Sequence, residues 1–80
     1  EGINLKQLLE IIVKNLVDEP DLVSISESKN NNTIILKLKV APDDMGKVIG
    51  KQGRIAKSIR NVLRAGATHN NEKVKLQILQ

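Results

Sequence analysis

A glycine-rich, basic stretch near the middle of the chain holds the residues whose chemistry is easiest to recognise. From Gly46 to Ile59 it reads GKVIGKQGRIAKSI, with three glycines, three lysines, one arginine and no acidic residue. Glycine has no Cβ atom, so its backbone can approach a phosphate closely, and neighbouring cations attract the phosphate's charge. These residue types indicate a binding site for a phosphate-bearing ligand.

The spacing of these residues does not match the phosphate loops of nucleotide-dependent enzymes. A Walker A loop has the pattern G-x-x-x-x-G-K-[ST], but Gly46 and Gly50 enclose three residues, and Gln52 follows the lysine. A dinucleotide-binding G-x-G-x-x-G loop would need glycine where Val48 and Lys51 stand. Both interpretations are therefore excluded.

Catalytic and metal-binding sites are not recognisable either. The chain has no cysteine and one histidine, so a thiolate metal site cannot form. That histidine, His69, is predicted to lie in an exposed turn, and no nucleophile has a recognisable base beside it. Asp43 and Asp44 follow Pro42 and suit the positive end of a helix dipole, whereas adjacent side chains on a helix diverge. We expect no enzymatic activity, no metal and no cofactor.

Length and composition predict one small domain covering residues 3–80. With 80 residues, 40% apolar and 28% charged, the chain is typical of an ordinary soluble fold. Its longest apolar runs, Ile11–Val13 and Ile34–Leu36, are far too short for a membrane span or a signal-peptide core. Together with the lack of cysteine, this predicts a cytoplasmic protein that does not contact a membrane.

The positive charge is concentrated in the second half of the chain. Residues 1–40 hold five basic and six acidic residues, whereas residues 41–80 hold eight basic and three acidic ones. Six cations follow one another without an intervening acid: Lys47, Lys51, Arg54, Lys57, Arg60 and Arg64. Such a run favours a polyanionic partner, with a solvated helix face as the alternative explanation.

Apolar periodicity predicts three helices that surround this stretch. Residues 5–17 form an amphipathic helix, with Asn4 and Gln7 as its capping box and a turn at Pro20 as its end. A helix of two turns over residues 45–49 stops at the first loop glycine, and another helix begins after the second. The end of this last helix is open, because Gly66 could be a C-cap or an interior packing glycine.

Alternating apolar residues predict three strands, over residues 23–26, 34–40 and 73–78. The polar turn Lys29–Asn32 joins the first two as an antiparallel hairpin. A crossover through the helix pair permits parallel pairing of the second and third strands, so the three-stranded sheet should be mixed. Each strand has one apolar face, which the three helices must cover in an α+β fold of order αββααβ. The other face is exposed and carries Lys37, Lys39 and Lys75.

The loop between the two later helices is a Gly-x-x-Gly turn, a pattern that any tight helix–helix connection could use. In this context, however, VIGKQG resembles the signature of the KH RNA-binding domain, and αββααβ is the order of the type II KH fold typical of bacteria. The segment VAPDDMGKVIGKQGRIAKSIRNVL, Val40 to Leu63, is similar to the small stand-alone bacterial KH proteins of the KhpA group. One departure is Ala56, where many KH domains have a large aliphatic residue.

The resemblance implies an RNA chaperone or post-transcriptional regulator that takes part in control of cell shape and division. It would hold single-stranded RNA, or single-stranded DNA, by its sugar–phosphate backbone at the Gly50–Gly53 loop. Lys51 and Gln52 would contact the backbone, flanked by Lys47, Arg54 and Lys57. The bases would lie between the helix pair and the second strand, in a groove whose aliphatic walls include Val48, Ile49 and Ile55.

The chain contains no Phe, Tyr or Trp. Recognition by aromatic stacking, as in RRM and OB folds, is therefore excluded, and we expect weak, salt-sensitive binding with low sequence specificity. Pairing would raise the avidity of so small a module. The resemblance implies homodimers and heterodimers with a larger KH-containing protein of the Jag type. The alternative function is a protein-interaction adaptor that dimerises with such a protein, with RNA binding secondary.

Overall fold

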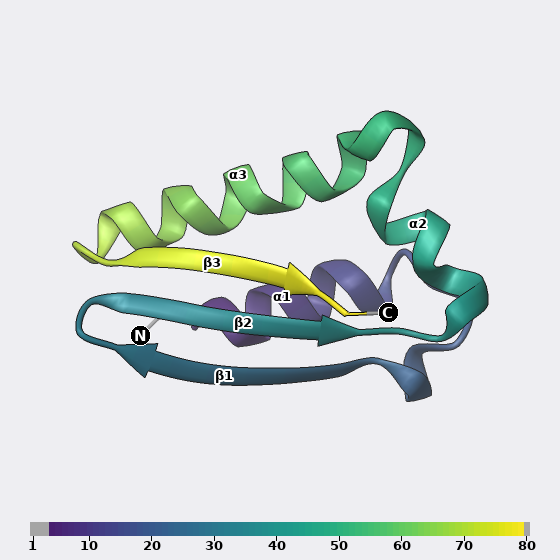
Figure 1. The fold of residues 1–80 in the computed structure, drawn as a ribbon, viewed down its shortest axis with the longest axis horizontal. Coiled ribbons are helices and arrows are strands. Elements are labelled where there is room, and N and C mark those ends of the chain that lie inside the picture. The colour runs from purple at the N-terminus through teal and green to yellow at the C-terminus, as the bar shows by residue number, and fades with distance from the viewer. Residues whose placement is uncertain (1–3, 80) are drawn as a thin grey trace.

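Helices and strands follow one another in the predicted order αββααβ over residues 4–79, the part of the chain that the computed structural model describes (Figure 1). Their bounds are α1 (Leu5–Lys14), β1 (Ser24–Asn30), β2 (Thr33–Lys39), α2 (Met45–Ile49), α3 (Arg54–His69) and β3 (Lys73–Ile78). Three short 3-10 turns, at Pro20–Leu22, Pro42–Asp44 and Lys51–Gly53, lie in the connections. No helix in this range is long and apolar enough to cross a bilayer.

The sheet is mixed, as predicted, with strand order β1-β2-β3. β1 runs antiparallel to β2, and β3 runs parallel to β2 after the α2–α3 crossover. Leu38 in β2 marks the register, because it lies opposite Ile25 of β1 and Ile78 of β3. β2 is thus the central strand, and both β1 and β3 are edges.

The core lies between one face of this sheet and the helices. Leu36 and Leu38 of β2 are fully buried, as are Leu9 of α1 and Leu63 of α3. Figure 1 shows α1 behind the sheet and α3 alongside β3. α2 adds Val48 to the same apolar cluster. The predicted two-layer α+β architecture, with one sheet face covered by three helices, is confirmed.

α1 begins as predicted but ends three residues early. The Asn4 side chain accepts the Gln7 N–H at 2.8 Å and the Gln7 side chain accepts the Asn4 N–H at 3.1 Å, which completes the capping box. The predicted end at residue 17 was wrong, because Asn15 takes the C-cap position and its side-chain amide donates to the Ile11 carbonyl at 2.7 Å. Val17 is nevertheless buried in the core.

The hairpin is longer and tighter than the sequence suggested. Lys29 and Asn30, predicted as turn residues, belong to β1, and Asn30 lies opposite Thr33. The turn itself is Asn31–Asn32, and Asn31 adopts φ of +57°. Asparagine tolerates this left-handed conformation, so a turn of two residues extends the pairing on both sides.

The end of α3 shows which of the two predicted roles Gly66 has. Gly66 lies inside α3, which continues to His69, so it is an interior packing glycine and not a C-cap. A Cβ atom at this position would lie 2.9 Å from Cδ2 of Leu5. α1 and α3 therefore pack closely at Gly66. His69 is exposed at the last residue of the helix, close to the turn in which it was predicted.

Candidate nucleic-acid interface

The Gly50–Gly53 loop has a backbone that requires glycine at its first end and favours it at its second. Gly50 has φ of +77° and ψ of 174°, a region almost closed to residues with a Cβ atom. A Cβ on Gly50 would also come within 2.6–2.9 Å of the Ile55 side chain. Gly53 is left-handed, with φ of +74°, and a Cβ there would meet no atom within 4 Å. The space beside Gly50 is therefore filled by the Ile55 side chain, whereas the space beside Gly53 is open.

The bare side of the loop leads directly into the first turn of α3. Gly53 is the N-cap of this sixteen-residue helix and supplies no side-chain hydrogen bond, and the first turn contains no acidic residue. The positive end of the helix dipole is therefore not neutralised by a neighbouring carboxylate. Lys51 and Gln52 are exposed between the two glycines, as predicted.

Three of the predicted cations surround this loop without an acidic partner. Lys51, Arg54 and Lys57 are exposed, and none of them forms an ion pair within residues 4–79. The Arg54 guanidinium donates to the side-chain oxygen of Gln52 at 3.3 Å. The loop and the start of α3 thus carry positive charge that no carboxylate within residues 4–79 pairs with.

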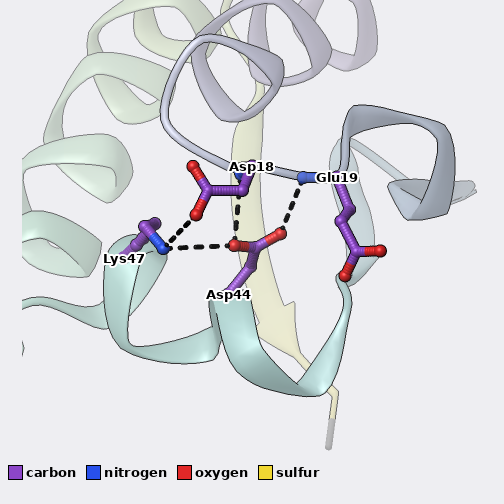
Figure 2. A network of polar contacts seen from close by, with 4 residues as sticks. All are labelled: Asp18, Glu19, Asp44 and Lys47. Carbon is purple, nitrogen blue, oxygen red and sulfur yellow. Dashed lines mark hydrogen bonds and ion pairs between the residues drawn. The ribbon is translucent and has the colours of Figure 1, made fainter.

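The fourth predicted cation, Lys47, is held in a structural network instead (Figure 2). Its ammonium lies 2.8 Å from the Asp18 carboxylate and 3.5 Å from that of Asp44. Asp44 is 1% exposed, and its two oxygens accept the backbone N–H groups of Asp18 and Glu19 at 3.1 and 3.0 Å. The network ties the start of α2 to the connection between α1 and β1.

This network gives Asp44 a role that the sequence did not show. Asp44 stands at the N-cap of α2 but makes no side-chain cap hydrogen bond there, because its carboxylate is turned to the α1–β1 connection. Burial by itself would raise the pKa of this carboxyl, but two backbone N–H donors and the Lys47 ammonium outweigh burial and hold the pKa below its ordinary value. The hydrogen bond to Asp18 raises the pKa of Lys47.

The predicted aliphatic walls are only partly available at the surface. Ile49 and Ile55 are half-buried, so part of each side chain faces solvent. Val48 is 0% exposed and packs in the core, so it cannot contact a ligand in this structure. Ala56, the departure from the KH pattern, is also buried. A small residue at this position fits a buried site in the first turn of α3.

The strand beside the helix pair is β3, not the second strand as predicted. α3 packs along β3, and a cleft of about 310 Å³ lies between them, lined by Arg60, Leu63 and Arg64 and by residues 74–77. β3 is the edge strand that packs against α3, whereas β2 is enclosed in the centre of the sheet, so the cleft opens at β3. A second hollow, lined by Thr68 and residues 72–75 among others, continues along the same edge.

Arg60 and Arg64 line this cleft but were absent from the predicted site. The Arg60 guanidinium is 3.5 Å from the Leu76 carbonyl oxygen, a long contact that leaves its charge largely free. Both arginines were visible in the basic run after Lys57, at the three- and four-residue spacing of one helix face. What the sequence did not show was which strand that face approaches. Within residues 4–79 no cluster of side chains suited to a metal ion is found.

The order αββααβ, the mixed sheet and the Gly-x-x-Gly loop between α2 and α3 define a type II KH fold. Solved structures share it at low sequence identity. Aquifex aeolicus Era bound to GDP·AlF4⁻ matches with a TM-score of 0.62 and 19% identity, over 92% of this chain and 29% of Era. Era in complex with MgGDPNP and nucleotides 1506–1542 of 16S ribosomal RNA matches with a TM-score of 0.64, over 92% of this chain and 28% of that one.

Sequence comparison places the chain more narrowly. The family model "KhpA/KhpB, KH domain" matches residues 6–78, and the chain belongs to this family. The RNA-binding protein KhpA of Clostridium acetobutylicum is 60% identical over 94% of this chain and 100% of its own length. That of Clostridium perfringens is 56% identical over the same shares, and that of Chlamydia trachomatis is 49% identical over 95% of this chain and 97% of its own length.

The two loop glycines should differ in how much stability they contribute. Gly50→Ala places a Cβ against Ile55 in a backbone region that excludes side chains, and we expect it to lower the free energy of unfolding by about 3 kcal/mol. Gly53→Ala should lower the free energy of unfolding by only about 1 kcal/mol, because alanine would have to adopt a left-handed conformation without a steric clash. Urea denaturation measures both values. Equal losses for the two variants would contradict the packing described for Gly50.

The Asp44 network should make stability depend on pH. Because the folded pKa of Asp44 is lowered, its ionised form stabilises the fold at neutral pH, and this stabilisation is lost as the pH falls below 3.8 toward the folded pKa. Asp44→Asn should therefore lower Tm by about 5 °C or more at pH 7, and the difference from the parent should shrink in acid. Thermal melts from pH 7 to pH 3 measure this. The exposed neighbour variant Asp43→Asn should leave Tm nearly unchanged, and equal effects at both positions would refute the network's role.

Proposed function

We propose that the chain is a non-catalytic RNA-binding module that holds single-stranded RNA at the Gly50–Gly53 loop. The observation that carries this proposal is the bare backbone above Gly53, which opens onto the unneutralised N-terminus of α3. A phosphate placed there would meet the positive end of the helix dipole, whereas the Gly53 and Arg54 N–H groups already donate to the carbonyl oxygens of Gly50 and Lys51. The names of the KhpA relatives, which describe them as RNA-binding proteins, support the same ligand class.

The neighbouring side chains would guide the rest of the RNA backbone. Lys51 and Gln52 reach outward between the glycines, and Arg54 and Lys57 extend the positive charge along the first turns of α3. We do not include Lys47 among the proposed RNA contacts, because its ammonium already contacts two carboxylates. Charge contacts of this kind carry no direct base information, so affinity should fall steeply with salt and discriminate weakly between sequences.

The bases would lie in the cleft between α3 and β3. Ile49 and Ile55, next to the loop in sequence, are half-buried, and the half-buried Val74 lines the cleft between α3 and β3. A KH module accommodates about four nucleotides of unpaired strand in this way. Aliphatic walls pack on base faces without aromatic stacking, which agrees with a chain that has no Phe, Tyr or Trp.

A double substitution in the loop tests this function. Lys51→Asp/Gln52→Asp places two carboxylates where the RNA phosphates would pass, and affinity for a fluorescent single-stranded RNA should fall at least about tenfold. The slope of log affinity against log salt should also become shallower, because at least one cation–phosphate contact is lost. Fluorescence anisotropy at two salt concentrations gives both quantities, with circular dichroism to confirm folding.

A matched control separates the loop from net charge. Lys6→Asp/Ala65→Asp changes the charge by the same amount at exposed positions on α1 and α3, and it should leave RNA affinity within about twofold of the parent. If both variants lost RNA affinity equally, the effect would come from net charge and not from the loop. Parent protein that binds no RNA at low salt would leave the adaptor function as the better account.

We also propose that the chain pairs with a second copy or with a larger KH protein of the Jag type. The match to a family named for both KhpA and KhpB supports such pairing. On the helical layer, Ile11 and Val62 are 49% and 46% exposed, and Leu16 is also exposed. Large aliphatic side chains at this exposure are suited to a contact with another chain.

Substitution of the exposed valine tests the homodimer. Val62→Lys should raise the dimer dissociation constant by about tenfold or more, because a charge would enter an apolar contact. Sedimentation equilibrium measures the constant, and Ser28→Lys, on the exposed sheet face opposite the helices, is the control with the same added charge. A parent protein that stays monomeric at high concentration, or equal effects of both substitutions, would rule out this surface for self-association.

A further inference from the structure

On the face of the sheet opposite the helices, all charged residues are basic. Alternation along the strands directs Lys37 and Lys39 of β2, and Lys73 and Lys75 of β3, away from the core, and all four side chains are exposed. The other outward positions of the described strands are serine, asparagine, threonine and glutamine, with one half-buried isoleucine. No carboxylate stands at any of these positions. We call the four lysines the lysine face.

The register spaces these charges without placing two directly opposite each other. Lys37 lies between Ser26 of β1 and Gln77 of β3, and Lys75 lies opposite Ile35. Lys37 and Lys75 are therefore diagonal neighbours, about 7–8 Å apart at the backbone, and the two lysines on each strand are about 7 Å apart. None of the four forms an ion pair within residues 4–79. Like charges at this density repel one another unless an anion lies between them.

The lysine face continues around an edge of the sheet toward the Gly50–Gly53 loop. Lys73 and Lys75 also line the hollows at the β3 edge, together with Arg64 and with Glu72, whose carboxylate is paired with Lys29. Arg60 follows one turn nearer the loop along α3. Positive side chains thus run from the sheet over the β3 edge to the loop, a path that one flexible polyanion can follow.

We propose that the lysine face is a second binding surface, which holds phosphates of the same RNA beyond the few nucleotides that the loop and cleft accommodate. The proposal rests on the proposed function for its ligand, but it concerns a different face of the molecule. Each ammonium would contact one phosphate, and the neighbouring serine and threonine hydroxyls would donate to phosphate oxygens. The surface would add affinity for longer RNA without reading its sequence.

Charge and shape favour a nucleic acid over a protein partner. A protein interface has an apolar core, whereas the only apolar residue among the outward positions is Ile35, which is half-buried. A row of cations with hydroxyls and no carboxylate is complementary to a regular chain of phosphates. The absence of aromatic residues from the chain excludes base stacking on this sheet, so the contact would be to the backbone alone.

The test compares RNAs of two lengths on a variant of β2. Lys37 and Lys39 do not line the cleft, so Lys37→Gln/Lys39→Gln should leave affinity for a tetranucleotide within about twofold of the parent. For a single-stranded 20-mer the same variant should lose about tenfold in affinity at low salt, and the salt slope should fall by about 1.4, or about 0.7 for each lost contact. Anisotropy competition against one labelled 20-mer gives all of these values.

Lys6→Gln/Lys14→Gln is the control, because it removes the same net charge from exposed positions on α1. If the 20-mer binds both variants equally well, the proposal is overturned, whether or not the tetranucleotide binds. Both surfaces are supported if two results are obtained together. Tetranucleotide binding should be lost only in Lys51→Asp/Gln52→Asp, and 20-mer affinity should fall in Lys37→Gln/Lys39→Gln. If tetranucleotide binding survives the loop substitution, the proposed function fails while the 20-mer result still decides the lysine face. Polyglutamate that competes as well as the 20-mer at equal charge would assign the face to acidic partners and overturn the RNA assignment.

Discussion

Burial of one aliphatic face of a three-stranded sheet is the constraint on which the rest of this structure depends. The chain has no aromatic residue, so the core must be built from close contacts among leucine, isoleucine and valine. Leu36 and Leu38 of the central strand are fully buried for this reason, and α1 and α3 must lie against the same side. The Gly50–Gly53 loop then projects at the end of the helical layer. The opposite face of the sheet is left to water, where lysine is tolerated.

A buried carboxylate sets the position of the short α2 helix. Five residues are too few to hold a helix in place by propensity, and α2 is anchored by Val48 in the core and by Asp44 at its start. The Asp44 carboxylate satisfies two backbone N–H groups that would otherwise be left without partners at the end of the α1–β1 connection. Lys47 supplies the cation that both carboxylates of this network contact. A cation in the middle of the basic run therefore serves the fold, while its neighbours Lys51 and Arg54 stay free for a ligand.

Much of the fold could be predicted because it follows from local rules. The Asn4–Gln7 capping box, the alternating strand residues and the glycines of the loop each satisfy a requirement set within a few residues. Errors arose at the ends of elements, where other local hydrogen bonds and turns competed with the apolar pattern. Asn15 ended α1 before its apolar period ran out, and the Asn31–Asn32 turn allowed β1 to extend farther than its apolar residues indicated. Apolar periodicity marks burial, whereas the end of an element depends on which hydrogen-bond partners are available.

The sequence by itself determined the αββααβ order, the Gly-x-x-Gly loop and the membership of the KhpA/KhpB family, because these depend on residue types and spacing along the chain. Only the tertiary structure decided which residues of the basic run are available to a ligand. It buried Val48, engaged Lys47 with Asp18 and Asp44, and brought β3 with Arg60 and Arg64 to the cleft. These outcomes depend on contacts between segments far apart in the chain, such as a carboxylate and an N–H group twenty-six residues apart. Helical or strand periodicity shows that a side chain faces inward or outward, but not which distant group it meets there.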